Sequence, residues 1–276
     1  MRFALLKDER IEATKGAKGV CPCCGNDLVA KCGEVYIHHW THKKKCDDHW
    51  WENETEWHRN WKNEFPSHWQ EVVHHDKSGE KHIADVKTDE DWTIEFQHSY
   101  LKPEERRSRN NFYKKLIWVV DGTRRKTDLT QFQNELNDGF LDKPSQKLFC
   151  VFSPESSRLL REWKDSDSLV LLDFKDGLSS DEGLWLIYPR MYKDNIFLSQ
   201  LSRSAFIEYL NNNKFDEIMD TVINPIKVTV EYSIKSNEKT TGYWNSKKDE
   251  SHMWLGLPKS FLGHLKLPYG VLIKIQ

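Results

Sequence analysis

The sequence predicts an α/β protein in which a mixed sheet is flanked by helices, preceded by a zinc-binding segment and followed by a β-rich region. Two observations predict this fold class. Five of the six cysteines fall between Cys21 and Cys46. Farther along, short runs rich in β-branched and aromatic residues alternate with helical patterns. We therefore expect three regions: a Cys/His segment at 1–50, a core at 51–210 and a β-rich module at 211–276.

The core is predicted to begin with a helix. Trp57, Trp61 and Phe65 recur every four residues, which places one aromatic stripe on a helix that Pro66 ends. Three antiparallel strands joined by tight turns should follow. They are expected in the runs 69–75, 81–87 and 92–98.

A second α/β unit should complete this core. A polar helix start at 104–115 precedes the apolar run 116–120, which is typical of a buried strand. The rest of the chain predicts more strands and one helix but indicates no chemistry. The further strands are expected in 147–153, 168–174, 183–189, 224–236 and 269–276, and the helix in 202–215.

Composition excludes some classes of protein. The formal net charge is −2, so any surface for nucleic acid must be local. No apolar run is long enough to span a membrane, and charged residues at 7–10 interrupt the place where a signal peptide would be apolar. We expect a cytoplasmic protein with no membrane partner.

The clustered cysteines indicate metal binding, since a secreted disulfide framework would be spread more evenly. Two residues separate Cys21 from Cys24, and the same spacing separates His39 from His42. Paired ligands of this kind chelate a tetrahedral ion, and Gly25 lets the backbone turn beneath the thiolates. The predicted ligands of a structural zinc are therefore Cys21, Cys24, His39 and His42. Four rivals compete for single positions: Cys23, Cys32, His38 and Cys46.

Two predicted strands carry acidic side chains in unusual places. Alternation along the strand places Glu95 and Gln97 on one face, and a hairpin can bring Asp85 beside Glu95. Two converging carboxylates repel each other unless a cation such as Mg²⁺ or Mn²⁺ lies between them. The alternative is that both carboxylates simply face solvent.

The order of these motifs decides between the two interpretations. An Asp on one strand and Glu-x-Gln on the next, preceded by a helix with a Glu, resembles the PD-(D/E)xK nuclease superfamily, which has a restriction-endonuclease-like core. The ordered set "CPCCG…HHWTH", "ETEWHRNWK", "IADV", "IEFQHS" and "RNNFYKKLIWVVDG" is similar to the competence protein CoiA-like family. This resemblance covers about Cys21 to Gly122.

The resemblance implies roles for several residues. Asp85 and Glu95 match the metal-binding carboxylates, and Glu56 matches the helix glutamate that completes the site, with Glu54 as the alternative. Gln97 stands where many members have a lysine, so it can orient a water but supplies no charge. His58 either approaches the phosphate or is a buried helix histidine bonded to a neighbour.

The resemblance also places Arg109 and Tyr113 toward the site, where an arginine suits a phosphate or the charge of a transition state. The implied reaction is Mg²⁺- or Mn²⁺-dependent hydrolysis of DNA by in-line attack of a metal-activated water. A basic surface for DNA would be local, and the same residues also serve solubility. Its members are Lys43, Lys44, Lys45, Arg106, Arg107, Lys114 and Lys115.

Two alternatives remain. The first is a zinc-dependent nucleic-acid binding module whose nuclease fold has lost activity. The second is an adaptor in which the C-terminal half recruits a protein partner or forms a homo-oligomer. The biological setting implied by the resemblance is DNA uptake and recombination or defence against foreign DNA.

Overall fold

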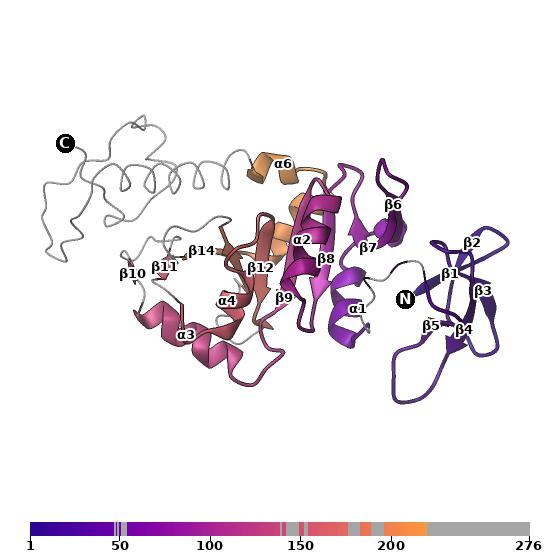
Figure 1. Ribbon diagram of the computed structural model, residues 1–276, viewed down its shortest axis with the longest axis horizontal. Coiled ribbons are helices and arrows are strands. Elements are labelled where there is room, and N and C mark those ends of the chain that lie inside the picture. The colour runs from indigo at the N-terminus through magenta and orange to yellow at the C-terminus, as the bar shows by residue number, and fades with distance from the viewer. Residues whose placement is uncertain are drawn as a thin grey trace, which may run out of the picture. The chain divides into compact units, whose positions relative to one another are not determined.

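The computed structural model describes residues 1–46, 48, 50, 54–138, 140–141, 149–151, 154–175, 183–188 and 196–219. The chain divides into two compact units, Met1–Asp121 and Gly122–Gln276. Both contain strands and helices, so the mixed α/β class is confirmed (Figure 1). The predicted boundaries near residues 50 and 210 stay predictions. Most of the predicted module at 211–276, including its two strands, lies outside the described residues.

Unit 1 begins with a small antiparallel sheet in the order β2-β1-β3-β4-β5. A buried cluster around Ala4, Leu28 and Trp40 forms its core. Gly19 is required there, because a Cβ at this position would lie 2.7 Å from the Cβ of Ala4. The strands are β1 (Phe3–Leu6), β2 (Glu9–Glu12), β3 (Lys18–Val20), β4 (Asp27–Lys31) and β5 (His39–His42).

The rest of unit 1 follows the predicted order closely. Helix α1 and the short helix η1 precede three antiparallel strands, and helix α2 precedes a strand that is parallel to its neighbour. Within this unit the strand order is β9-β8-β7-β6. The bounds are α1 (Glu56–Asn63), η1 (Ser67–Trp69), β6 (Gln70–His75), β7 (Lys81–Lys87), β8 (Thr93–Gln97), α2 (Pro103–Phe112) and β9 (Leu116–Asp121).

The aromatic stripe of α1 packs on the sheet as its spacing predicts. Trp61 is fully buried and stacks on Phe96 of β8, with ring centroids 5.6 Å apart. Helix α2 is fixed by Asn110, whose side chain accepts a hydrogen bond from the indole of Trp118 on β9 at 2.8 Å. Every residue of β8 and β9 is buried, as expected for strands covered on both faces.

Unit 2 contains a sheet portion in the order β10-β11-β14-β13-β12 with α3 packed against α4. The expected strands at 147–153, 168–174 and 183–189 are present as β11, β12 and β13. The bounds are α3 (Asp128–Asp138), β10 (Phe140–Leu141), β11 (Phe149–Val151), α4 (Arg158–Trp163), β12 (Leu169–Asp173), β13 (Leu184–Ile187), β14 (Ile196–Leu201), α5 (Arg203–Asn211) and α6 (Phe215–Ile218). No helix among the described residues is long and apolar enough to cross a bilayer.

Candidate functional site

A group of metal-ligand side chains lies at one end of the small sheet. The donor atoms of Cys21, Cys24, His42 and Cys46 all lie within 4.8 Å of one another. The Sγ atoms of Cys24 and Cys46 are 3.7 Å apart, and Sγ of Cys24 is 3.5 Å from Nε2 of His42. Sulfurs bound to one tetrahedral zinc with bonds of about 2.3 Å are separated by roughly 3.8 Å. The four residues can therefore hold a zinc ion.

Local backbone structure explains how these donors meet. Cys21 and Cys24 lie in the turn after β3, where Gly25 has φ +70° and donates its N–H to the carbonyl of Cys21 at 2.9 Å. Pairing of β4 with β5 places His42 opposite Leu28, beside this turn. The predicted role of Gly25 is thus confirmed, because its left-handed conformation lets the chain turn beneath the two sulfurs.

The prediction of His39 as a ligand is wrong. His39 and His42 are both in β5, where residues three apart point to opposite faces and lie roughly 10 Å apart along the strand. The Nδ1 of His39 instead lies 2.9 Å from the carbonyl oxygen of Ile37. Cys46, one of the four rivals, takes its place in the cluster. The other rivals, Cys23, Cys32 and His38, are not part of it.

The electrostatics of the cluster suit a metal that displaces protons. Burial raises the pKa of Cys21 to about 11 and that of Cys46 to about 12. Burial also lowers the pKa of His42, which keeps the imidazole neutral. Because zinc binds thiolates and neutral imidazole, loading this cluster releases protons from the cysteines.

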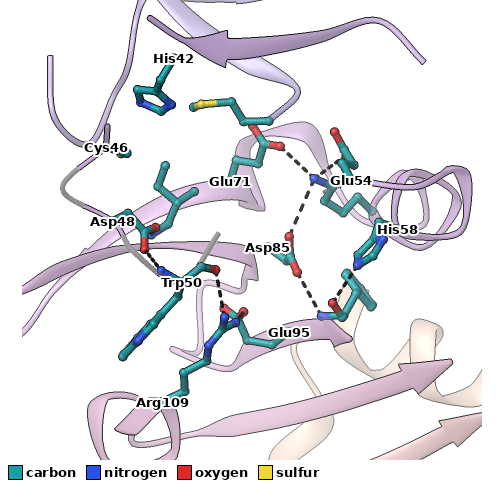
Figure 2. Close-up of a pocket in the computed structure, with 14 residues that line it drawn as sticks. His42, Cys46, Asp48, Trp50, Glu54, His58, Glu71, Asp85, Glu95 and Arg109 are labelled. Atoms are coloured by element: carbon teal, nitrogen blue, oxygen red, sulfur yellow. Dashed lines mark hydrogen bonds and ion pairs between the residues drawn. The ribbon is translucent and has the colours of Figure 1, made fainter. Parts of the chain in front are cut away.

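A pocket next to this cluster contains the predicted carboxylates. His42 and Cys46 line it together with residues of α1, β6, β7, β8 and α2 (Figure 2). Five carboxylates face the pocket together with the cationic side chains of one lysine and one arginine. They are Asp48, Glu54, Glu71, Asp85, Glu95, Lys62 and Arg109.

Asp85 lies where β7 and β8 separate. The ladder pairs Lys87 with Thr93 and Val86 with Ile94. One step farther, Oδ2 of Asp85 accepts the backbone N–H of Phe96 at 3.1 Å. The backbone N–H of Phe96 is thus bonded to the side chain of Asp85 and not to a backbone carbonyl of β7. The opening between the strands is where Asp85 and Glu95 face a common pocket (Figure 2).

Glu95 is a buried carboxylate whose pKa is strongly raised. Its side chain is 6% exposed, and Oε2 accepts a hydrogen bond from Nη1 of Arg109 at 3.0 Å. Its other oxygen, Oε1, is buried without a hydrogen-bond partner among the described residues. Burial and then the negative charge of Asp85 raise the pKa of Glu95 to about 8, against the opposing charge of Arg109. An unsatisfied buried carboxylate oxygen fits a missing cation.

Lys62 is a pocket residue that sequence reasoning missed. Its Nζ lies 2.6 Å from Glu54, 2.8 Å from Glu71 and 3.9 Å from Asp85. Burial acts to lower the pKa of Lys62, but Glu71 and Glu54 outweigh burial and leave it raised. Helical spacing was the available signal, because Lys62 follows His58 by four residues and shares its face of α1.

Glu71 has a strained backbone that serves this network. Its φ is +49°, in the left-handed region that a glutamate rarely adopts. Its carboxylate accepts the Nζ of Lys62 and the backbone N–H groups of Arg2 at 2.6 Å and Phe3 at 2.9 Å. The position of Glu71 therefore joins the pocket to β1 of the small sheet.

Comparison with known proteins found no match: the chain matches no protein-family model, no curated protein and no solved structure. The resemblance inferred from its motifs therefore stays an expectation.

The prediction of Glu56 as the helix carboxylate is wrong. Glu56 is exposed in the first turn of α1, whereas the alternative, Glu54, lines the pocket. Glu54 is bound by Lys62 and by Arg59, whose Nη2 lies 2.8 Å from its Oε2. These cations outweigh burial and lower the pKa of Glu54. Glu54 precedes the helix, so its direction does not follow from helical periodicity.

His58 lines the pocket but has the role of a buried helix histidine. Its Nδ1 accepts the backbone N–H of Thr55 at 3.2 Å, as part of the capping box of α1. Its Nε2 lies 3.0 Å from the carbonyl oxygen of Phe96. Because both ring nitrogens are engaged, the bonded alternative describes His58 better than a group that approaches a phosphate.

Two other predicted residues lie outside the pocket lining. Gln97 is buried, and its amide donates to the carbonyl of Ser99 at 3.2 Å, so it is directed along the chain and not toward Asp85. Tyr113 is buried against Phe112, with ring centroids 4.8 Å apart. Its hydroxyl has no hydrogen-bond partner among the described residues. Neither Gln97 nor Tyr113 contacts the pocket in the way that the motif implied.

Arg109 is in the pocket as expected. Its guanidinium donates to Glu95 at 3.0 Å, to the carbonyl of Trp50 at 2.9 Å and to Glu105 at 2.5 Å. Arg106, by contrast, is 3% exposed and cannot belong to the predicted basic surface. Its place near the start of α2 turns it inward, while Arg107 faces solvent. The other exposed members are Lys43, Lys44, Lys45 and Lys114, with Lys115 half-buried.

Proposed function

We propose that this protein is a metal-dependent nuclease that hydrolyses DNA phosphodiester bonds at the pocket between β7 and β8. One observation carries the proposal: Asp85 and Glu95, from adjoining strands, face one pocket, and Glu95 keeps a buried oxygen without a partner among the described residues. Hard oxygen ligands of this kind suit Mg²⁺ or Mn²⁺. The motif resemblance and the mixed sheet flanked by α1 and α2 agree with it.

Asp85 and Glu95 would hold the divalent cation. The third carboxylate near them, Glu54, is already neutralised by Lys62 and Arg59, so it is the weaker ligand. Among the described residues, the group of three or more His, Cys, Asp and Glu donors whose ligand atoms all lie within 4.8 Å of one another is the Cys21/Cys24/His42/Cys46 cluster, so the pocket carboxylates do not form a closed set of three ligands. The remaining positions of an octahedral ion would therefore be filled by water and substrate, as is usual for Mg²⁺.

The chain supplies two cations beside these carboxylates. A bound divalent ion would lower the pKa of a water ligand and offset phosphate charge. Arg109 has donors next to Glu95, and Lys62 has its Nζ 3.9 Å from Asp85. Both can stabilise the negative charge that builds on the scissile phosphate. Lys62 is thus the candidate for the cationic helper that Gln97 cannot be.

The substrate class rests on the resemblance and on local charge. Lys43, Lys44 and Lys45 are exposed in the loop that follows β5, on the same segment as the zinc ligand Cys46. Such lysines would bind the phosphate backbone without reading bases, and the binding would weaken as salt rises. Uptake and recombination of DNA, or defence against foreign DNA, are the settings in which we place this activity.

The test is cleavage of single-stranded, duplex and branched DNA with Mg²⁺ or Mn²⁺. We expect Glu95→Gln and Asp85→Asn to lower the rate at least ~100-fold, because each removes a cation ligand. Glu56→Gln is the matched control, since Glu56 is an exposed glutamate of the neighbouring helix. Equal cleavage by the intact protein and Glu95→Gln would refute the site.

A second function is favoured by the way in which Lys62 already neutralises part of the pocket. Its ammonium lies among three carboxylates, which is the arrangement expected where a lysine has replaced a metal. The protein would then be a zinc-dependent nucleic-acid binding or adaptor protein without catalysis. DNA binding without cleavage, and no calorimetric signal for Mg²⁺ or Mn²⁺, would support this function.

A further inference from the structure

The zinc cluster and the carboxylate pocket are connected by a short segment that no motif predicts. Cys46 is a member of the cluster, and it also lines the pocket with Asp48 and Trp50. Asp48 and Trp50 follow Cys46 by two and four residues. Figure 2 shows Cys46, Asp48, Trp50 and Arg109 along one side of the pocket. We call these described positions, Cys46, Asp48 and Trp50, the connecting segment.

Asp48 attaches the connecting segment to β7. Its Oδ1 lies 2.9 Å from Nδ1 of His82 and accepts the backbone N–H of Trp50 at 3.0 Å. Its Oδ2 accepts the backbone N–H of Ile83 at 2.9 Å. The attachment point is two residues before Asp85.

Trp50 attaches the same segment to α2. Its ring stacks on His82, with centroids 3.3 Å apart and planes 11° apart. Its carbonyl accepts Nη2 of Arg109 at 2.9 Å, and the guanidinium lies 5.3 Å from the indole centroid. Nη1 of the same guanidinium donates to Glu95. A series of contacts therefore leads from Asp48 through Trp50 and Arg109 to Glu95, and Asp48 follows Cys46 by two residues.

We infer that metal binding at Cys46 sets the geometry of the carboxylate pocket, with Asp48 and Trp50 as positioning residues for Arg109 and Glu95. Coordination fixes the first residue of the connecting segment, Asp48 fixes the middle, and the carbonyl of Trp50 orients the guanidinium. The zinc is then more than a support for β1 to β5. The inference deepens the proposed function, because it makes the divalent-cation site depend on the zinc site.

The physical reason is the number of contacts made by Cys46, Asp48 and Trp50 within a few positions of the sequence. A segment held at both ends and in the middle has little conformational freedom, whereas release of one end restores it. Arg109 would then lose the carbonyl acceptor that orients its guanidinium, and Glu95 would have a less defined hydrogen-bond partner. Preorganised ligands bind an ion more tightly than mobile ones.

The test measures Mn²⁺ affinity of zinc-loaded protein by the electron paramagnetic resonance of free Mn²⁺. We expect Cys46→Ser to weaken Mn²⁺ binding at least ~10-fold, and the matched variant Cys32→Ser, a cysteine outside the cluster, to bind as the intact protein does. Because Cys46→Ser can also impair folding, a second pair of variants, in which all four zinc donors are retained, is measured as well. Asp48→Ala should weaken Mn²⁺ binding with zinc retained, and Asp27→Ala, an exposed aspartate of β4, should not.

The outcomes separate this inference from the proposed function. Unchanged Mn²⁺ affinity in both Cys46→Ser and Asp48→Ala overturns the coupling. Mn²⁺ binding with no DNA cleavage refutes the nuclease and leaves the coupling intact. If the intact protein binds no Mn²⁺, the coupling is tested by hydrogen exchange of the backbone amides of α2. Zinc loading should slow this exchange in the intact protein but not in Asp48→Ala. If zinc loading leaves the hydrogen-exchange rate of α2 unchanged in the intact protein, the inference is overturned.

Discussion

Unit 1 contains two groups of metal-ligand side chains that differ in how their own neighbours satisfy them. The Cys21/Cys24/His42/Cys46 cluster consists of buried thiols and one imidazole, whose donors mainly face one another. The carboxylates of the pocket are already bound by Lys62, Arg59 and Arg109. The sulfur cluster therefore needs an added cation, whereas the pocket has most of its countercharge from the protein.

The Cys/His cluster and the carboxylate pocket should therefore respond differently to added metal ions. Soft thiolates bind zinc strongly, and a site formed by a turn, a strand and a loop has little other reason to hold its shape. A hard ion at Asp85 and Glu95 must instead compete with the ammonium of Lys62 and with protons on Glu95. We expect the zinc to be structural and tightly held, and the pocket ion to exchange readily.

Loss of zinc should have the largest effect. We expect Cys21→Ser to lose the bound zinc and to unfold β1 to β5 at moderate temperature, because structural zinc contributes about 10 kcal/mol or more of apparent binding energy to small domains. Zinc content and circular dichroism on heating measure this. Cys32→Ser should keep both properties of the intact protein. A Cys21→Ser protein with a full zinc equivalent and an unchanged melting temperature would break the comparison.

Removal of the internal countercharge should come next. Lys62→Met keeps the length of the side chain but leaves Glu54 and Glu71 without their shared cation. We expect the free energy of unfolding to fall by roughly 3–5 kcal/mol in the absence of divalent ions, as for other broken buried ion pairs. Added Mg²⁺ or Mn²⁺ should restore part of this stability if the ion can take the place of the ammonium.

The matched control for that variant is Lys114→Met, which removes an exposed lysine and should leave stability nearly unchanged. Urea unfolding with and without Mn²⁺ makes the measurement. A Lys62→Met protein as stable as the intact one would mean that the pocket does not depend on its internal cation.

A pH titration should reveal the charge on Glu95. Its pKa is raised to about 8 in the folded chain from the ordinary 4.5, chiefly by burial. The folded protein therefore holds this proton more tightly than the unfolded one. The contribution of Glu95 to the free energy of unfolding is fully present below about pH 4.5. It falls by about a few kcal/mol as the pH rises to about 8.

We expect Glu95→Gln to flatten this loss, because glutamine does not ionise. The measurement is urea unfolding between pH 5 and pH 8.5 with zinc present and without Mg²⁺ or Mn²⁺. Added Mn²⁺ should oppose the loss in the intact protein but not in Glu95→Gln. Parallel curves for the two proteins across this range would argue against a raised pKa of Glu95.

Much of the fold could be predicted because its signals are local. Aromatic spacing marked α1, β-branched runs marked β6 to β8, and the apolar run marked β9. The site was predicted in part for the same reason: Asp85, Glu95 and Arg109 lie on regular elements, where periodicity decides which face they occupy. The pairing of Cys21 with Cys24 also followed from a short turn with Gly25.

The sequence predictions were wrong where tertiary contacts determine which way a side chain points. Spacing alone does not distinguish His39 from His42 as a ligand. In a strand, however, the side chains of residues three positions apart point to opposite faces. Glu56 matched a motif, yet it is exposed in the first turn of α1, whereas Glu54 lines the pocket, where Lys62 and Arg59 bind it. Lys62 was missed because a buried lysine is recognised by its partners, and these are Glu71 of β6, Asp85 of β7 and Glu54, two positions before α1.

The two glutamates near α1 provide the smallest and most local test. Glu54 is bound by Lys62 and Arg59, and its pKa is lowered, whereas Glu56 faces solvent. We expect Glu54→Gln to reduce stability at pH 7 by about 1–3 kcal/mol, and Glu56→Gln to change it by less than about 0.5 kcal/mol. The folded pKa of Glu54 is depressed, so its contribution is present above about pH 4.5 and is lost progressively as the pH falls from that value toward the depressed folded pKa. Urea unfolding of both variants at pH 7 and pH 3 measures this, and a pH-independent deficit in Glu54→Gln would mean that shape, not charge, makes Glu54 important to the pocket.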